Sequence, residues 1–165
     1  MDKGFYSNKN VLYLLGDEKR TPMLFLLAVP FTTSFARRQA AERKDIDCVE
    51  NTILINGESL RAITKKCVWG KGQTVFVHIY YNANKAHAIR EKLYAKITCL
   101  REKGITDPES AQKNKECVKY LIVRKSENNQ LGYTVTIRKD VIEKELEDAG
   151  RLILLAMRSV LRRKH

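Results

Sequence analysis

The stretch Met23-Leu24-Phe25-Leu26-Leu27-Ala28-Val29 is uniformly apolar and follows a polar connector. The run is too short for a typical buried helix, whereas it suits a strand that is covered on both faces of a sheet. The preceding segment predicts a helix with Ser7 as its N-cap, Leu15 as its last residue and Gly16 as its stop. Residues 1–30 therefore predict the later part of an α/β sheet: a turn, a helix and a central strand.

A change of hydrophobic period follows a predicted helix over residues 33–49. Asn56-Gly57 is a strong hairpin signal, and residues 70–72 form a second turn with two glycines. The flanking segments are rich in β-branched and aromatic residues, which favour strands. The sequence predicts an antiparallel meander with strands at 52–55, 60–69 and 74–81.

The second half of the chain alternates between helical and strand patterns. An apolar stripe at three- and four-residue steps predicts a long helix over 83–103, ended by Gly104. Asp107-Pro108 predicts the start of another helix, because proline suits the first helical position. Further predicted elements are strands at 120–124, 133–138 and 152–157, a helix at 141–149 capped by Asp140, and a basic tail at 158–165.

Composition points to a polyanionic partner. The 165 residues include 31 Lys and Arg against 19 Asp and Glu, a formal net charge of +12. Such a surplus favours a phosphate-bearing polyanion, because neutralising phosphates releases condensed counterions. No apolar run is long enough to span a bilayer, and the start lacks the features of a signal peptide, so we expect a cytoplasmic protein with no membrane partner. The four cysteines lack metal-binding spacing and are expected to be reduced thiols.

The first residues, Met1-Asp2-Lys3-Gly4-Phe5-Tyr6-Ser7, place a carboxylate just before a glycine and a helix start. Glycine allows a sharp turn, and a carboxylate is a hard oxygen ligand that suits Mg²⁺ or Mn²⁺. Asp2 to Ser7 resembles the Asp-Arg-Gly-Phe-Tyr-Ser motif of insertion-sequence transposases, which have a DDE active site and an RNase H-like fold. Similar segments follow in the same order at 23–29, 77–82 and 150–155.

The resemblance implies that the chain is a transposase fragment. Asp2 would be the second of three catalytic, metal-binding carboxylates, with the first aspartate upstream of Met1 and the glutamate downstream of His165. The family's reaction is metal-dependent DNA cleavage and strand transfer, the recombination step of DNA transposition. Mg²⁺ (or Mn²⁺) would serve the full-length protein. We expect no tight metal binding by this fragment and no activity in isolation, and homo-oligomerisation of the full-length form is left open.

The resemblance also implies a fold and a domain division. We expect an α+β chain in which residues 1–31 are the C-terminal part of an RNase H-like catalytic core, a remnant of its α/β sheet. Residues 32–165 would form a mixed, mainly antiparallel insertion domain with a long helix, followed by the basic tail. Glu143, Glu145 and Glu147 are interpreted as a solvated helix face, and Trp69 as a core residue.

Basic residues at predicted strand ends and turns are the candidates for DNA contact: Lys65, Lys66, Lys71, Arg124, Lys125 and Arg138. Contacts to the DNA backbone would be salt-dependent and poorly sequence-specific. Two alternatives to a transposase stay open. One is a non-catalytic basic nucleic-acid-binding domain, for which Asp2→Ala has no effect. The other is a protein-interaction domain whose charge is incidental, which predicts no salt-dependent DNA binding.

Overall fold

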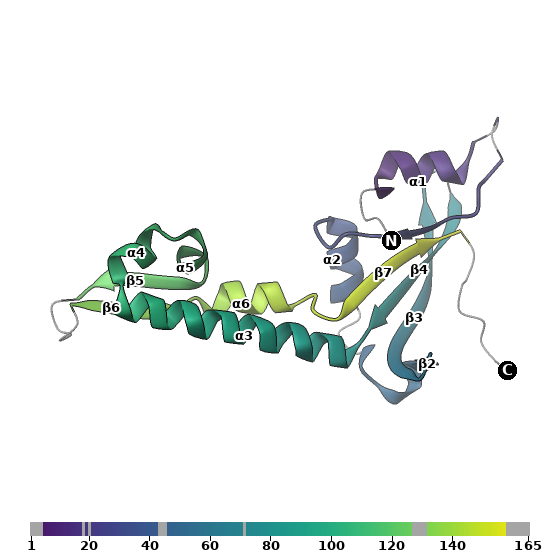
Figure 1. The fold of residues 1–165 in the computed structure, drawn as a ribbon. Helices are drawn as coiled ribbons and strands as arrows, with labels where there is room; N and C mark the ends of the chain where they lie inside the picture. Colours follow the sequence, from purple (N-terminus) through teal and green to yellow (C-terminus); the bar gives the residue numbers. More distant parts are fainter. Residues whose placement is uncertain are drawn as a thin grey trace. The chain divides into compact units, whose positions relative to one another are not determined.

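The computed structural model describes residues 5–17, 19, 21–42, 46–70, 72–126 and 132–157. The chain divides into two compact units, a first unit of residues 1–83 with 151–165 and a second unit of residues 84–150 (Figure 1). The predicted α+β class is confirmed, because an antiparallel sheet and helices are both present. The domain boundary expected after residue 31 does not coincide with this division. No helix in the described ranges has the length and apolarity that crossing a membrane requires.

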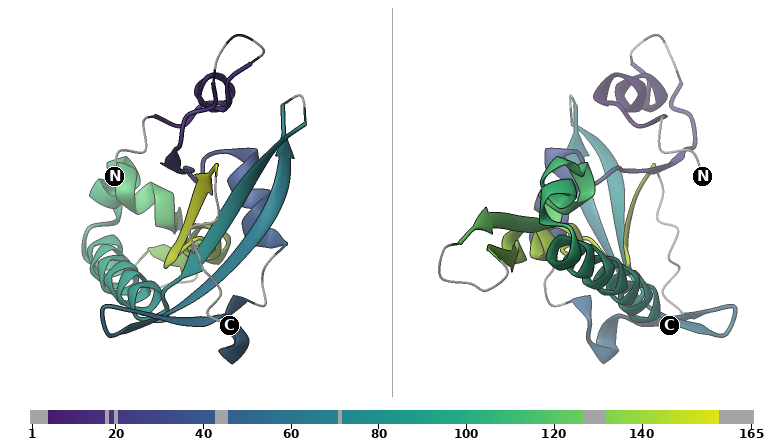
Figure 2. Two further views of the ribbon diagram at one scale, coloured as in Figure 1. Left: turned by 90° about the vertical axis from the view of Figure 1, so that its right-hand side faces the viewer. Right: turned by 60° about the vertical axis from the view of Figure 1, so that its left-hand side comes forward.

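The first unit is built on a five-stranded sheet in the order β1-β7-β4-β3-β2. All neighbouring strands are antiparallel. The strands are β1 (Leu26–Ala28), β2 (Thr52–Ile55), β3 (Glu58–Trp69), β4 (Gln73–Tyr81) and β7 (Arg151–Ala156). The predicted meander is therefore confirmed as β2-β3-β4. The last of the described strands, β7, lies beside β4 and separates it from β1 (Figure 2).

The apolar run at 23–29 is not a central strand, so that prediction is wrong. Only Leu26–Ala28 are in strand conformation, and β1 is an edge of the sheet formed by the described residues. It pairs on one side with β7, and Leu24 just before it is 69% exposed. Uniform hydrophobicity shows that a segment has apolar neighbours, but it does not show that a strand lies on each side of it.

One face of the sheet carries the core of the first unit. Helices α1 (Asn8–Leu15) and α2 (Ser34–Ala41) pack there, contributing Leu15 and Ala40 to a buried cluster with Val77, Ile79 and Leu155. Alternate residues of β4 and β7 reach this face because side chains alternate along a strand. The predicted cap of α1 by Ser7 and its end at Gly16 are confirmed.

Helix α2 is shorter than predicted. It begins after its N-cap Thr33, close to the predicted start, but it ends at Ala41 rather than near Val49. A short 3-10 turn, η3 (Val49–Asn51), then leads directly into β2. The predicted hairpin turn after β2 is confirmed, with Asn56 at φ 51° and Gly57 at φ 82°, as a type I′ turn requires.

The second unit packs helices against a two-stranded ribbon. Its elements are α3 (Ala83–Thr106), which begins at the boundary, α4 (Pro108–Lys113), α5 (Lys115–Tyr120), β5 (Leu121–Lys125), β6 (Tyr133–Ile137) and α6 (Lys139–Leu146). Its core includes Leu93, Ile97 and Leu100 of α3 together with Tyr120 and Leu121. The helix expected to start at Pro108 is divided at Asn114, whose side-chain oxygen accepts from two amides of α5. Likewise α6 begins at Lys139, so Asp140 lies in its first turn and does not cap it.

Gly104 lies inside α3 instead of ending it. The helix continues to Thr106, and Gly104 is buried. A β-carbon at this position would lie 3.3 Å from Val135 Cγ1 and 3.5 Å from Leu121 Cδ1. The glycine therefore allows the helix to approach the β5–β6 ribbon closely, a tertiary role that resembles a helix stop when only the sequence is seen.

Replacing leucines on opposite faces of β7 tests which face of the sheet forms the core. Leu155 is fully buried, whereas Leu152 is 39% exposed. We expect Leu155→Ala to lower the free energy of unfolding by about 3 kcal/mol, through lost burial and a residual cavity. Leu152→Ala should cost less than about 1 kcal/mol. Urea denaturation of both variants measures the difference, and equal costs would contradict the assignment of the packed face.

Candidate functional site

The described part of the N-terminal motif forms the entrance to α1. Ser7 Oγ accepts a 3.0 Å hydrogen bond from the Asn10 amide, and Asn10 Nδ2 donates to Phe5 O at 2.8 Å. Tyr6 packs against the core of the first unit, and burial raises the pKa of its phenol. Phe5, Tyr6 and Ser7 thus each have a definite structural partner. Asp2, the predicted catalytic and metal-binding residue, lies outside the described residues.

No cluster of three or more His, Cys, Asp or Glu side chains that could hold a metal ion occurs in the described part of the chain. The metal site expected around Asp2 thus stays a prediction. The four cysteines are free thiols, and their surroundings range from buried for Cys117 to exposed for Cys99. Trp69 packs edge-on against Phe35 with ring centroids 5.0 Å apart, at the border of the first unit's core.

The three DNA-contact candidates of the first unit do not form one cluster. Lys65 and Lys66 follow each other on β3 and therefore lie on opposite faces of the sheet. Lys65 Nζ is 2.7 Å from Glu42 Oε2, so a carboxylate already pairs with its charge. Lys66 Nζ lies 5.9 Å from the centre of the Phe76 ring on the neighbouring strand. Lys71 lies outside the described residues.

The candidates of the second unit lie at two ends of the β5–β6 ribbon. Arg124 and Lys125 are exposed where β5 ends. Arg138 follows β6 and lies beside the start of β5, because its amide donates to Tyr120 O at 2.8 Å. Its guanidinium Nη1 donates to Val118 O, in the last turn of α5, at 3.2 Å. The sequence alone could not show that Arg138 lies at the opposite end of the ribbon from Arg124 and Lys125.

The positive charge is concentrated in the first unit. Residues 1–83 and 151–165 carry 17 Lys and Arg against 8 Asp and Glu, a net charge of +9, whereas residues 84–150 carry 14 against 11, a net charge of +3. Part of this charge has structural partners. Arg61 Nε lies 3.1 Å from Asp47 Oδ1, and Arg151 Nη1 donates to Ala40 O at 2.9 Å.

The second face of the sheet combines a buried histidine with half-exposed side chains. His78 is fully buried, and its Nδ1 lies 2.8 Å from Thr64 Oγ1 on the paired strand. Tyr80 follows on the same face, and burial raises the pKa of its phenol. Alternation along β4 places His78 on the face opposite the aliphatic core, whereas its pairing with Thr64 depends on strand register.

A charged cluster in the second unit connects α5 with α6. The Tyr120 hydroxyl donates to Glu145 at 2.9 Å and accepts from Lys119 Nζ at 2.9 Å, while Lys119 Nζ lies 2.6 Å from Glu145. These hydrogen bonds raise the pKa of Lys119. Partial burial alone would raise the pKa of Glu145, but the hydrogen bonds from Lys119 and Tyr120 outweigh it and lower that pKa. Lys96 pairs with Glu116 beside the Tyr120 ring.

Glu145 is therefore more than part of a solvated helix face, which corrects the interpretation from sequence. Its spacing from Glu143 and Glu147 contains no signal for this role, because the partners come from α5, about 25 residues earlier in the chain. Lys119, Tyr120 and Glu145 are all bound to one another, and their contacts join α5 to α6 beside the core of the second unit.

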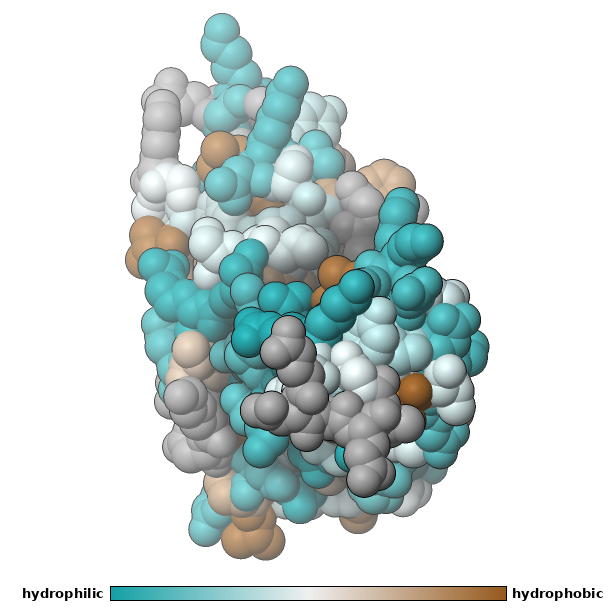
Figure 3. Space-filling model, turned by 90° about the vertical axis from the view of Figure 1, so that its left-hand side faces the viewer, coloured by the Kyte–Doolittle hydropathy of each residue, from teal (hydrophilic) through white to brown (hydrophobic). Residues whose placement is uncertain are grey.

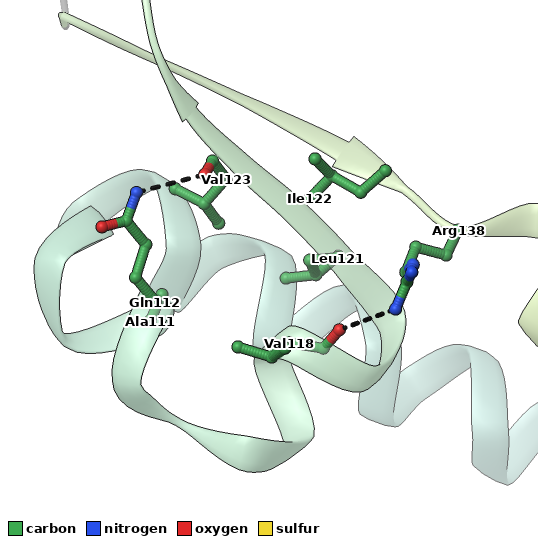
Figure 4. Close-up of a pocket in the computed structure, with 7 residues that line it drawn as sticks. All are labelled: Ala111, Gln112, Val118, Leu121, Ile122, Val123 and Arg138. Atoms are coloured by element: carbon green, nitrogen blue, oxygen red, sulfur yellow. Dashed lines mark hydrogen bonds between the residues drawn. The ribbon is translucent and has the colours of Figure 1, made fainter.

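A shallow cavity of about 300 Å³ opens beside β5 in the second unit. Most of its lining is apolar, and two long polar side chains, Gln112 and Arg138, stand at its margins (Figure 4). Around this end of the second unit the surface is mainly hydrophilic, and hydrophobic side chains appear singly (Figure 3). The complete lining is Ala111, Gln112, Val118, Leu121, Ile122, Val123 and Arg138.

Comparisons of the chain with protein-family models, with curated proteins and with solved structures found no match.

The cluster around Glu145 predicts a pH-dependent contribution to stability. A carboxylate whose pKa is lowered by folding stabilises the folded state above its ordinary pKa of 4.5, and this stabilisation is lost as the pH falls through the lowered value. We expect Glu145→Gln to reduce the free energy of unfolding at pH 7 by at most about 1 kcal/mol, because the pair is partly exposed and screened. The deficit should shrink as the pH falls below 4.5 through the lowered pKa, as measured by chemical denaturation at pH 7 and at a series of acidic pH values.

Glu143→Gln is the matched control, because it removes the same charge from an exposed position of the same helix. Equal effects of the two substitutions at pH 7 would show that net charge, and not the contact with Lys119 and Tyr120, is responsible.

Proposed function

We propose that the chain is part of an insertion-sequence DNA transposase, in which Asp2 is one metal-binding carboxylate and the first unit contacts the DNA backbone. The observation that carries the proposal is the structure of the motif's second half. Ser7 caps α1, Asn10 holds Phe5 O, and Tyr6 packs on the sheet core. Residues 5–7, which resemble part of a catalytic motif, thus form the packed segment that leads into α1. Asp2 precedes this segment by three positions in the sequence.

The chemistry follows from the carboxylate and the charge. Metal-dependent DNA cleavage and strand transfer need carboxylates that together hold two ions, which would supply activation of a water or a 3′-hydroxyl and stabilisation of the leaving oxygen. Mg²⁺ or Mn²⁺ would supply this when bound by Asp2 and further carboxylates, since one aspartate cannot hold two ions. A remnant of an RNase H-like sheet in residues 1–31 belongs to the same proposal.

The DNA contact rests on the first unit's net charge of +9. Phosphate neutralisation by lysine and arginine favours binding of any sequence and weakens steeply with salt. The second candidate function, a basic nucleic-acid-binding domain without chemistry, is supported by the same charge. The two proposals differ in what they require of Asp2, so a metal-binding experiment separates them.

Adjacent lysines on β3 provide a matched test of the DNA contact. The charge of Lys65 is paired with Glu42, whereas no carboxylate partner of Lys66 is found among the described residues. We expect Lys66→Gln to reduce the slope of log K against log salt by about 1 for a duplex of arbitrary sequence. Lys65→Gln removes the same charge but should leave the slope nearly unchanged. Fluorescence anisotropy over a salt series measures both, and identical slopes for the two variants would refute a local contact at Lys66.

Paramagnetic Mn²⁺ tests the role of Asp2 in the intact chain, because line broadening detects even weak binding. We expect low concentrations of Mn²⁺ to broaden the amide signals of Tyr6 and Ser7, which lie within about 18 Å of Asp2 along the chain. Asp2→Asn should abolish the broadening. Asp17→Asn, which removes another carboxylate near α1, should not. Broadening that is absent, or that survives Asp2→Asn, would favour the non-catalytic alternative.

A further inference from the structure

We propose that the outer edge of β5 binds an extended acidic peptide segment, which adds as a further strand to the β5–β6 ribbon of the second unit. This inference is independent of the proposed transposase function, because it concerns a different unit and a different class of partner.

The register of the ribbon shows which main-chain groups are available. The Arg138 amide donates to Tyr120 O at 2.8 Å, and the Ser126 amide donates to Gly132 O at 2.9 Å. These two bonds fix the even-numbered residues of β5 as the ones that exchange hydrogen bonds with β6. The main-chain groups of Leu121, Val123 and Lys125 therefore point away from β6. No strand of the described residues pairs with this outer edge.

Two of the outward-pointing main-chain groups form hydrogen bonds with partners other than a neighbouring strand. The Leu121 amide donates to Cys117 O, at the end of α5. Val123 O accepts a 3.1 Å bond from Gln112 Nε2, a side-chain amide that occupies the position of a neighbouring strand's N–H (Figure 4). The Val123 amide and Leu121 O have no hydrogen-bond partner within the described ranges. Gln112 is exposed, so an incoming peptide amide can displace it.

The cavity beside this edge supplies a place for a side chain. Its apolar lining includes Ala111 and Val118, and Val118 is 49% exposed. A volume of about 300 Å³ accommodates a single aliphatic side chain with room to spare. Strand addition works in this way, because main-chain hydrogen bonds give affinity and pockets for alternate side chains give specificity.

The positive charge around the outer edge of β5 favours an acidic peptide. Arg138 stands at one end of the cavity, and Arg124 and Lys125 lie at the far end of β5. Arg138 Nη1 donates to Val118 O, and no carboxylate within the described ranges pairs with the guanidinium. The planar guanidinium retains further donors that suit a carboxylate. A second copy of this chain fits less well, because edge-to-edge pairing of β5 would bring the same basic residues together.

The test uses the full 165-residue chain and a short acetylated peptide of alternating glutamate and valine. Titration followed by amide NMR should shift the Val123 signal and protect its amide from hydrogen exchange. A peptide of the same sequence with N-methylated amides on its edge-facing residues is the matched control, because it keeps charge and side chains but cannot pair. Binding of both peptides with equal affinity would overturn the proposal.

Protein variants distinguish a specific contact of the Arg138 guanidinium from a general effect of net charge on peptide binding. Arg138→Gln should weaken peptide binding about tenfold, whereas Arg101→Gln on α3, with the same loss of charge, should leave it within about twofold. If Arg138→Gln disturbs the end of α5, replacing glutamate by glutamine in the peptide gives the same readout on the intact protein. Equal binding of the glutamate and glutamine peptides would overturn the charge requirement. Shifts of Val123 and Arg138 produced by a DNA duplex, or by concentration of the chain alone, without a response to peptide, would also overturn the proposal.

Discussion

The antiparallel pairing of β4 with β7 is the constraint on which the first unit depends. It brings together Val77 with Leu155 and Ile79 with Ile153, and these four buried side chains form the centre of the core under α1 and α2. β1 joins the sheet through β7, which is the one strand it pairs with among the described residues. Because Tyr81 pairs with Arg151, the whole second unit is inserted where a hairpin would have a short loop.

Local chemistry could be predicted from sequence where it is decided by neighbouring residues. The cap of α1 by Ser7, the Asn56-Gly57 turn and the start of α4 after Asp107 all follow from interactions within about four residues. Features set by distant residues could not be predicted. The order of the strands makes β1 an edge strand. Gly104 lies inside a helix because it packs closely against Val135, and Glu145 pairs with the distant Lys119. For the candidate site, the sequence could predict which types of residue take part. It could not predict which basic side chains are already paired with carboxylates, because strand register and burial decide this.

The two units differ in what their surfaces can recognise. The first concentrates positive charge and holds the aromatic and hydroxyl half of the motif that begins at Asp2, and the proposed contact with DNA rests on these two features. The second has a lower net charge, a charged cluster that joins its helices, and a strand edge that no described strand pairs with, beside a small apolar cavity. Nucleic-acid contact and peptide contact are thus proposed for separate units.

Deletion of the second unit tests most directly whether the β4–β7 pairing closes the first unit around the inserted segment. Residues 82–150 would be replaced by an Asn-Gly turn that joins Tyr81 to Arg151, the last pair of the β4–β7 register. We expect the shortened chain to unfold cooperatively and to retain cross-strand NMR contacts between the Val77 and Leu155 backbones. An unfolded chain, or a folded one without those contacts, would contradict it.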